Sequence, residues 1–271
     1  YKRQSSDSLW LGPLKQPVRI ATLAFSAVAA VTYVWLFVNT LVFEDAIDMF
    51  DMIRPEGRII VWTMLISLSG AILFASIYFS DQKGAIQAPP DGFFDIISLI
   101  TSRMAMIMIA LIVIVMFYEV VSRYVFSRPT LWANELSLWI AGFVFLFAGQ
   151  YAMQQRSHIR IYVIYDMMPR WMQKTADVIS LTLLLCFTFA LVWGGYSDAM
   201  RRMLRMETFG TAWDPPLPGT LKPAILIIIV LVAIQAVSNL IADWNKKPEH
   251  HSPLDEIDET EIKNIRRTLE E

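Results

Sequence analysis

The chain has 271 residues, of which 55% are hydrophobic and 18% are charged, and its mean hydropathy is +0.46. A water-soluble domain of this length carries more charge, so the composition excludes a soluble globular enzyme and a disordered scaffold. A single cysteine excludes a disulfide-stapled secreted domain. The net charge of -2 gives no indication of nucleic acid as a partner.

Six apolar runs are each long enough to cross the roughly 30 Å hydrocarbon core of a bilayer as a helix. They cover about residues 20–43, 59–79, 104–118 with amphiphilic flanks from 93 to 126, 136–153, 178–197 and 223–242. Pro223 suits the first turn of the last helix. The sequence therefore predicts an all-α integral membrane protein with six transmembrane helices.

The composition divides the chain into four regions. We expect a cytoplasmic N-terminal segment over residues 1–17, a two-helix transmembrane extension over 18–90, a four-helix unit over 91–244 and a polar cytoplasmic tail over 245–271. The tail is interpreted as a solvated appendage rather than a second domain. A segment near residues 159–173 is too short and too charged to cross the membrane. It predicts an interfacial amphipathic helix on the cytoplasmic face.

The distribution of positive charge predicts the orientation. With both termini in the cytoplasm, 15 of the 23 Lys and Arg residues fall on the inner side and 8 on the outer side. Arg201, Arg202, Arg205 and Lys222 form a basic group on the predicted outer side. This group is either an exception to the rule or a site for an anionic partner.

The spans contain few groups that could carry chemistry. The three histidines, His158, His250 and His251, all lie outside the spans, so no bis-histidine haem pair can form within the bilayer. No metalloprotease, hydrolase, nucleotide-binding or cysteine-cluster motif is present. The sequence therefore predicts a protein that is not an enzyme and holds no cofactor or metal.

Ionisable residues gather at the outer helix ends. Glu119 and Arg123 are four residues apart, so they share a helix face and can pair. Glu135 follows Trp132 at the start of the fourth span. These residues indicate either an interfacial salt bridge with an aromatic anchor or a contact with a specific partner. Small residues such as Gly142 allow close helix packing, within this chain or on another subunit.

The outer loop over residues 206–218 contains three prolines and a tryptophan that we expect to be exposed. A proline-stiffened loop beside a basic group is typical of a docking surface, although it could also be a tight cap on two helices. The candidate docking residues on the periplasmic side are Arg201, Arg202, Arg205, Trp213, Pro215 and Pro216.

Four short segments occur in a recognisable order. They are residues 119–126 (EVVSRYVF), 132–135 (WANE), 154–159 (QQRSHI) and 165–169 (YDMMP). Their order and spacing, over about residues 93–244, resemble the small membrane subunit of tripartite ATP-independent periplasmic (TRAP) transporters, the DctQ-type family.

The resemblance implies a non-catalytic partner of a large permease subunit in the bacterial inner membrane. The large subunit would carry the sodium and substrate sites and move as an elevator, while this chain would brace its immobile scaffold. A periplasmic binding protein would deliver an organic acid, a carboxylate or a sulfonate, to the outer face. The motif residues implied as structural are Glu119, Arg123, Tyr124, Trp132 and Glu135 on the outer side, Arg156 and His158 at the start of the amphipathic helix, and Pro169 before the fifth span.

Two other functions stay open at this point. One is a membrane-anchor subunit of a redox complex, and the other is a free-standing carrier or channel. The first two spans lie outside the usual four-helix unit of the family. We expect them to widen the scaffold against lipid, or to add contacts to the large subunit or the binding protein.

Overall fold

The computed structural model describes residues 8–43, 46–82, 90, 92–155, 165 and 168–244. Helices dominate these ranges, and no strand occurs in them. The six long helices are α1 (Lys15–Val42), α3 (Ile59–Ser80), α4 (Phe93–Tyr124), α5 (Ala133–Gln154), α7 (Arg170–Leu204) and α8 (Leu217–Asp243). A 3-10 turn, η1 (Gly12–Leu14), precedes α1, and a short helix, α2 (Met49–Ile53), lies between α1 and α3. All six long helices are long and apolar enough to span a membrane. The prediction of an all-α membrane protein with six spans is confirmed.

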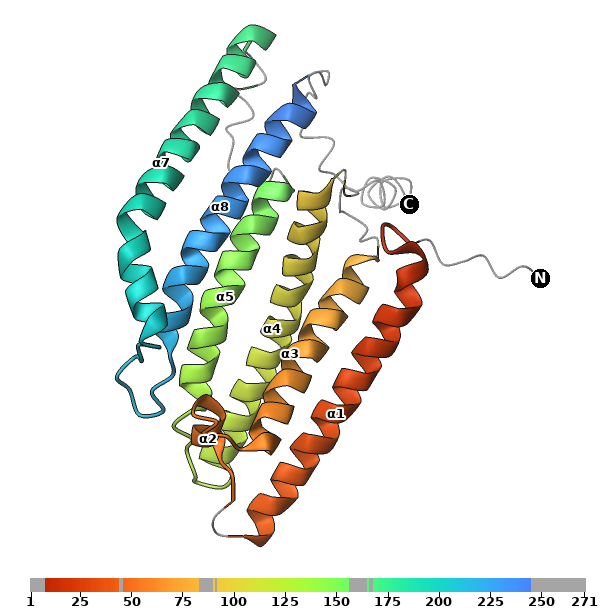
Figure 1. Ribbon diagram of the computed structural model, residues 1–271, viewed down its shortest axis with the longest axis vertical. Helices are drawn as coiled ribbons and strands as arrows, with labels where there is room; N and C mark the ends of the chain where they lie inside the picture. Colours follow the sequence, from red (N-terminus) through yellow and green to blue (C-terminus); the bar gives the residue numbers. More distant parts are fainter. Residues whose placement is uncertain are drawn as a thin grey trace, which may run out of the picture.

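The six helices stand side by side in a single row, in the order α1, α3, α4, α5, α8 and α7 (Figure 1). The chain follows this order except that α8 returns between α5 and α7, so α1 and α7 form the two edges of the row. One end of the row carries the start of α1 and the end of α8 (Figure 1). We call the opposite end, which carries α2 and the segments 125–132 and 205–216, the loop end (Figure 1).

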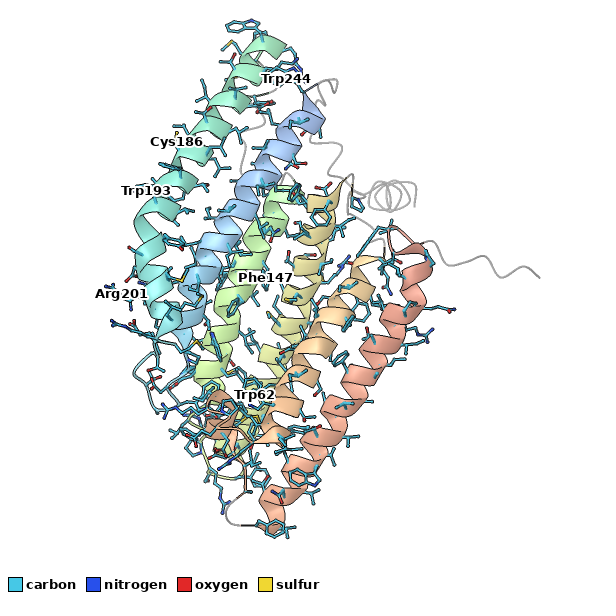
Figure 2. All side chains as sticks on the ribbon, viewed as in Figure 1. Trp62, Phe147, Cys186, Trp193, Arg201 and Trp244 are labelled. Atoms are coloured by element: carbon cyan, nitrogen blue, oxygen red, sulfur yellow. The ribbon has the colours of Figure 1, made fainter. Side chains whose placement is uncertain are left out.

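A single row leaves most of each helix uncovered. In the most apolar window of α3 22% of the residues are buried within the chain, and in that of α7 only 6%. Figure 2 shows side chains on every side of the helices; Cys186 and Trp193, for example, lie exposed on α7. The apolar surface of this chain is therefore available to lipid or to another protein.

Glycines and aromatic rings set the closest helix contacts. A Cβ atom at Gly70 of α3 would lie 2.5 Å from the ring of Phe25 on α1, and that ring also stacks on Phe74 at a centroid distance of 5.3 Å. A Cβ atom at Gly142 of α5 would lie 2.6 Å from the side chain of Leu221 on α8. These small residues pack within the chain, whereas Gly149 has no neighbour within 4 Å of such an atom.

Asp81 fixes the start of α1 to the end of α3. Its carboxylate is fully buried and accepts hydrogen bonds from the Trp10 amide at 2.9 Å, the Leu11 amide at 3.0 Å and the Ser8 hydroxyl at 3.0 Å. Lys15 lies 2.9 Å from its other oxygen. Burial by itself raises the pKa of Asp81, but the two amides, Lys15 and Ser8 together lower that pKa below its ordinary value.

The ends of two helices differ from the prediction. Helix α7 begins at Arg170 rather than near residue 178 and continues to Leu204, because its polar first and last turns are held by side-chain contacts that hydropathy does not register. Helix α8 begins at Leu217, so the placement of Pro223 in the first turn is wrong. Pro218 takes that position, and Pro223 lies inside the helix.

Several predictions fall outside the described residues. Arg156 and His158 are among these, as are residues 159–164, 166 and 167 of the expected amphipathic helix, residues 1–7 and the tail from 245 to 271. At the end of the expected amphipathic segment, Arg170 and the residues after it belong to α7 instead, and Pro169 is the residue that precedes this helix.

Candidate functional site

The carboxylate of Glu119 organises the end of α4. Its side chain is 5% exposed and pairs with Arg123, whose Nε donates to Oε1 at 2.8 Å. The second oxygen accepts from the hydroxyl of Thr130 and from its amide, at 2.9 Å. The predicted pair is thus confirmed, and Thr130, which the sequence reading missed, completes it. Glu119 closes the turn between α4 and α5.

Aromatic side chains flank this turn. Tyr124, the last residue of α4, is 78% exposed at the loop end. Trp132 precedes the first residue of α5 and stacks on Tyr118 with 5.7 Å between ring centroids. Both positions suit aromatic anchors near a membrane surface.

Glu135, in the first turn of α5, binds the segment that joins α7 to α8. Its Oε2 accepts from the Thr211 hydroxyl at 2.6 Å, from the Trp213 amide at 3.3 Å and from the Asp214 amide at 3.2 Å. We define residues 205–216 as the α7–α8 loop. Glu135 therefore holds this loop by accepting hydrogen bonds from it.

The expectation of an exposed tryptophan in this loop is wrong. Trp213 is 2% exposed, and its indole N–H donates to the backbone oxygen of Met49 in α2 at 2.8 Å. Its ring contacts that of Trp139 at a centroid distance of 6.4 Å. Pro215 is also buried, while Pro216 is half-buried directly before α8. The local sequence suggested exposure, but elements distant in the sequence cover these side chains. Trp213 and Pro215 therefore stabilise the loop from within and offer little surface to a partner.

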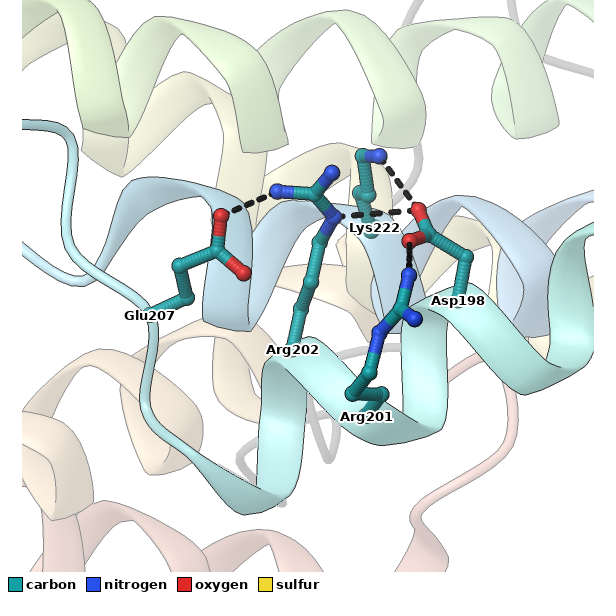
Figure 3. A network of polar contacts seen from close by, with 5 residues as sticks. All are labelled: Asp198, Arg201, Arg202, Glu207 and Lys222. Carbon is teal, nitrogen blue, oxygen red and sulfur yellow. Dashed lines mark hydrogen bonds and ion pairs between the residues drawn. The ribbon is translucent and has the colours of Figure 1, made fainter.

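The basic group is largely neutralised within the chain. Asp198 accepts from Arg201 at 2.7 Å, from Arg202 at 3.0 Å and from Lys222 at 2.5 Å, and Arg202 also pairs with Glu207 (Figure 3). Three cations thus share two carboxylates, which leaves an excess of one positive charge. This network joins the end of α7 to the start of α8 and leaves little free charge for an anionic ligand. Arg205 lies beside it and is exposed.

The α7–α8 loop also folds on itself. The Gly210 amide donates to Asp214 at 2.6 Å, and the Phe209 amide donates to the Pro215 oxygen at 3.1 Å. Asp214 adopts a φ of +60°, which other contacts must maintain. The Gly210 amide, ahead of the opposing effect of burial, holds the pKa of Asp214 below its ordinary value, and Arg54 at 3.3 Å contributes. Residues 208–212 form a continuous exposed tip.

The polar amides inside the spans tie helices together. Gln235 of α8 donates to Asp95 of α4 at 2.6 Å, and Asn239 donates to the Met153 oxygen of α5 at 2.7 Å. Gln150 contacts Thr101 at 3.4 Å. Among the residues described, no group of three or more His, Cys, Asp or Glu side chains could hold a metal ion.

The comparisons with known proteins decide the family. Residues 112–246 match the family model for tripartite ATP-independent periplasmic transporters, DctQ component. The chain belongs to the DctQ family. No curated protein and no solved structure matches it. As a DctQ component, the chain is the small membrane subunit of such a transporter, and the family is one of transporter components rather than enzymes.

Some residues of the loop end lie inside the matched region and others lie outside it. Glu119, Glu135 and the whole α7–α8 loop lie within the DctQ match. We call α1 and α3 the N-terminal helix pair. Met49 and Arg54, which contact the same loop, lie in the segment that joins these two helices, outside the match. The loop of the DctQ region is thus held partly by residues that the family model does not include.

Proposed function

We propose that this DctQ subunit braces the immobile scaffold of a large multi-span permease and helps to dock a periplasmic binding protein. The complex would take up an organic acid, a carboxylate or a sulfonate, by sodium symport, with an elevator motion in the large subunit. The sodium and substrate sites belong to that partner. The loop end faces the periplasm, both termini face the cytoplasm, and the membrane is the bacterial inner membrane.

The single row of helices carries this proposal. A carrier has to surround its substrate with protein at mid-membrane, and one layer of helices encloses nothing by itself. A flat row does provide a long apolar face against which a second protein can pack. Since at most 22% of the residues in any span's apolar window are buried within the chain, that face is extensive. A supporting role therefore fits this architecture better than a free-standing carrier or channel does.

A redox membrane anchor is supported less well. Haem ligation within a bilayer needs histidines in the spans, and the three histidines of this chain lie between the fourth and fifth spans and in the tail. The buried amides Gln150 and Gln235 connect helices and do not exchange protons at neutral pH.

The exposed tip of the α7–α8 loop is the proposed contact for the binding protein. Glu135 and the internal bonds of the loop hold residues 208–212 in one conformation, which lowers the entropy lost on docking. Phe209 at the tip is 46% exposed, and Arg205, four residues earlier in the loop, is exposed too. An aromatic and an arginine side chain are typical of residues that dominate protein interfaces.

Reconstitution into liposomes tests the proposed function. The chain alone should give no solute flux, whereas the chain together with the large permease and the binding protein should give sodium-dependent uptake of an organic acid. Flux through liposomes that contain this chain alone would refute the supporting role and favour a free-standing carrier.

A further inference from the structure

The N-terminal helix pair reaches the α7–α8 loop through α2. In the row, α1 and α3 lie on the far side of α4 and α5 from α7, and α3 packs against α4. Figure 1 shows α2 at the loop end, by the ends of α4 and α5, and it also contacts α3. From that position its Met49 oxygen accepts the indole N–H of Trp213 at 2.8 Å.

A second contact joins the same two segments. Arg54, directly after α2, lies 3.3 Å from the Asp214 carboxylate. Trp213 and Asp214 are the two loop residues whose amides Glu135 binds from the other side. The loop is therefore held between α5 of the DctQ region and α2, which joins the N-terminal helix pair.

Helix α2 is defined by its own local bonds. Asp48 accepts from the Asp51 amide at 3.3 Å, and Asp51 accepts from the Asp48 amide at 3.0 Å, which together form a capping box. Arg58 pairs with Asp51 at 2.7 Å. A segment fixed in this way presents the Met49 oxygen in a defined place, and a buried indole N–H needs such an acceptor.

The conformation of the loop depends on these outside contacts. Met206 and Asp214 both have positive φ angles, of 44° and 60°, which side chains other than glycine rarely adopt. Such backbone persists only where surrounding contacts determine it. If the contact with α2 were lost, the large apolar ring of Trp213 would face water, and the positions of residues 208–212 would no longer be fixed.

We propose that the N-terminal helix pair, acting through α2, holds the α7–α8 loop in the conformation that meets the periplasmic binding protein. This inference rests on the proposed function of the loop tip as a docking contact. It gives the two helices outside the DctQ match a specific role, in which Trp213 and Arg54 are positioning residues.

The test uses the full chain in complex with the large permease. Trp213→Phe removes the N–H donor and part of the indole ring but keeps an aromatic side chain, so it disturbs the packing less than alanine would. Arg54→Gln removes the charge pair to Asp214. Its matched control is Arg128→Gln, because Arg128 is an exposed arginine of the same loop end that lies in the segment 125–132 and not at α2.

Hydrogen exchange of amides 209–214 and the affinity of the purified binding protein are the two measurements. Trp213→Phe should raise the exchange rates about five- to tenfold, the effect of one buried hydrogen bond, and weaken binding by a similar factor. Arg54→Gln should raise them about twofold, since an exposed ion pair contributes little, and Arg128→Gln should leave them unchanged.

The two possible failures are distinguishable. Unchanged loop exchange in both Trp213→Phe and Arg54→Gln would overturn the role of the helix pair, whatever happens to uptake. Faster loop exchange with unchanged affinity for the binding protein would overturn the proposed docking function of the loop, and the inference with it.

Discussion

Replacement of Glu135 by alanine should release the α7–α8 loop. The carboxylate accepts from the Thr211 hydroxyl at 2.6 Å and from the amides of Trp213 and Asp214 at 3.3 and 3.2 Å. Hydrogen bonds to a charged group contribute about 1.5–3 kcal/mol each, but the two amide contacts are long and the side chain is half-buried. We therefore expect a total of about 2–3 kcal/mol, which corresponds to roughly a 30- to 150-fold larger population of the open loop.

Glutamine at the same position separates charge from geometry. Most of the bonds converge on Oε2, so the amide oxygen of Glu135→Gln can take that place while its nitrogen takes the place of Oε1. The remaining cost is the loss of charge assistance, about 1 kcal/mol, or roughly a fivefold change.

Hydrogen exchange of amides 211–214 in the assembled complex measures both effects. Asn134→Ala is the control, because Asn134 is the exposed neighbour of Glu135 on the same turn. Exchange in Glu135→Ala within twofold of the wild-type rate would refute the conclusion that this carboxylate holds the loop.

Three further predictions follow from other parts of the chain. Asp81→Asn should destabilise the pairing of α1 with α3 by about 2–3 kcal/mol, seen as faster exchange of amides 10–15. Because the pKa of Asp81 is lowered in the folded chain, its contribution is complete above the unfolded value of about 3.9 and is lost only as the pH falls through the folded value. Wild-type protection should thus be constant between about pH 8 and 5, and a marked loss over that range would contradict the argument. Gly219→Ala should lower the free energy of unfolding by about 1–3 kcal/mol, since its Cβ would lie 3.0–3.2 Å from backbone atoms of Glu207 and Arg202. Gly149→Ala meets nothing within 4 Å and should be neutral or slightly stabilising, so equal melting temperatures for the two variants would refute this. Arg205→Glu should slow association of the binding protein up to about tenfold at low salt and leave the membrane complex intact. Arg202→Glu should also destabilise the helix ends, because Arg202 pairs with two carboxylates. An unchanged association rate in Arg205→Glu would argue against docking near this residue.

The spans can be predicted from the sequence because the bilayer acts on each helix separately. Every crossing needs about 20 apolar residues in succession, and this requirement is visible in any window of that length. The helix ends are less predictable. The last turns of α7 depend on the contact of Asp198 with Lys222, which lies on another helix and leaves no local pattern.

The candidate site can be predicted only where its contacts are local. The spacing of Glu119 and Arg123 places them on one helix face, so their pairing follows from the sequence. Trp213 shows the opposite case. Three prolines and polar neighbours indicate an exposed loop, yet the side chain is covered from α2, 164 positions away in the sequence. Its acceptor is a backbone oxygen, which every residue type supplies, so no residue pattern signals it.

The central claim is that this chain is the small subunit that supports a large permease, and co-purification tests it most directly. A tag on the full chain, co-expressed with the large multi-span subunit and extracted in mild detergent, should recover a stable complex of the two, and this complex should bind the periplasmic protein. Recovery of this chain alone, with the large subunit folded in the same membranes but unbound, would contradict the account.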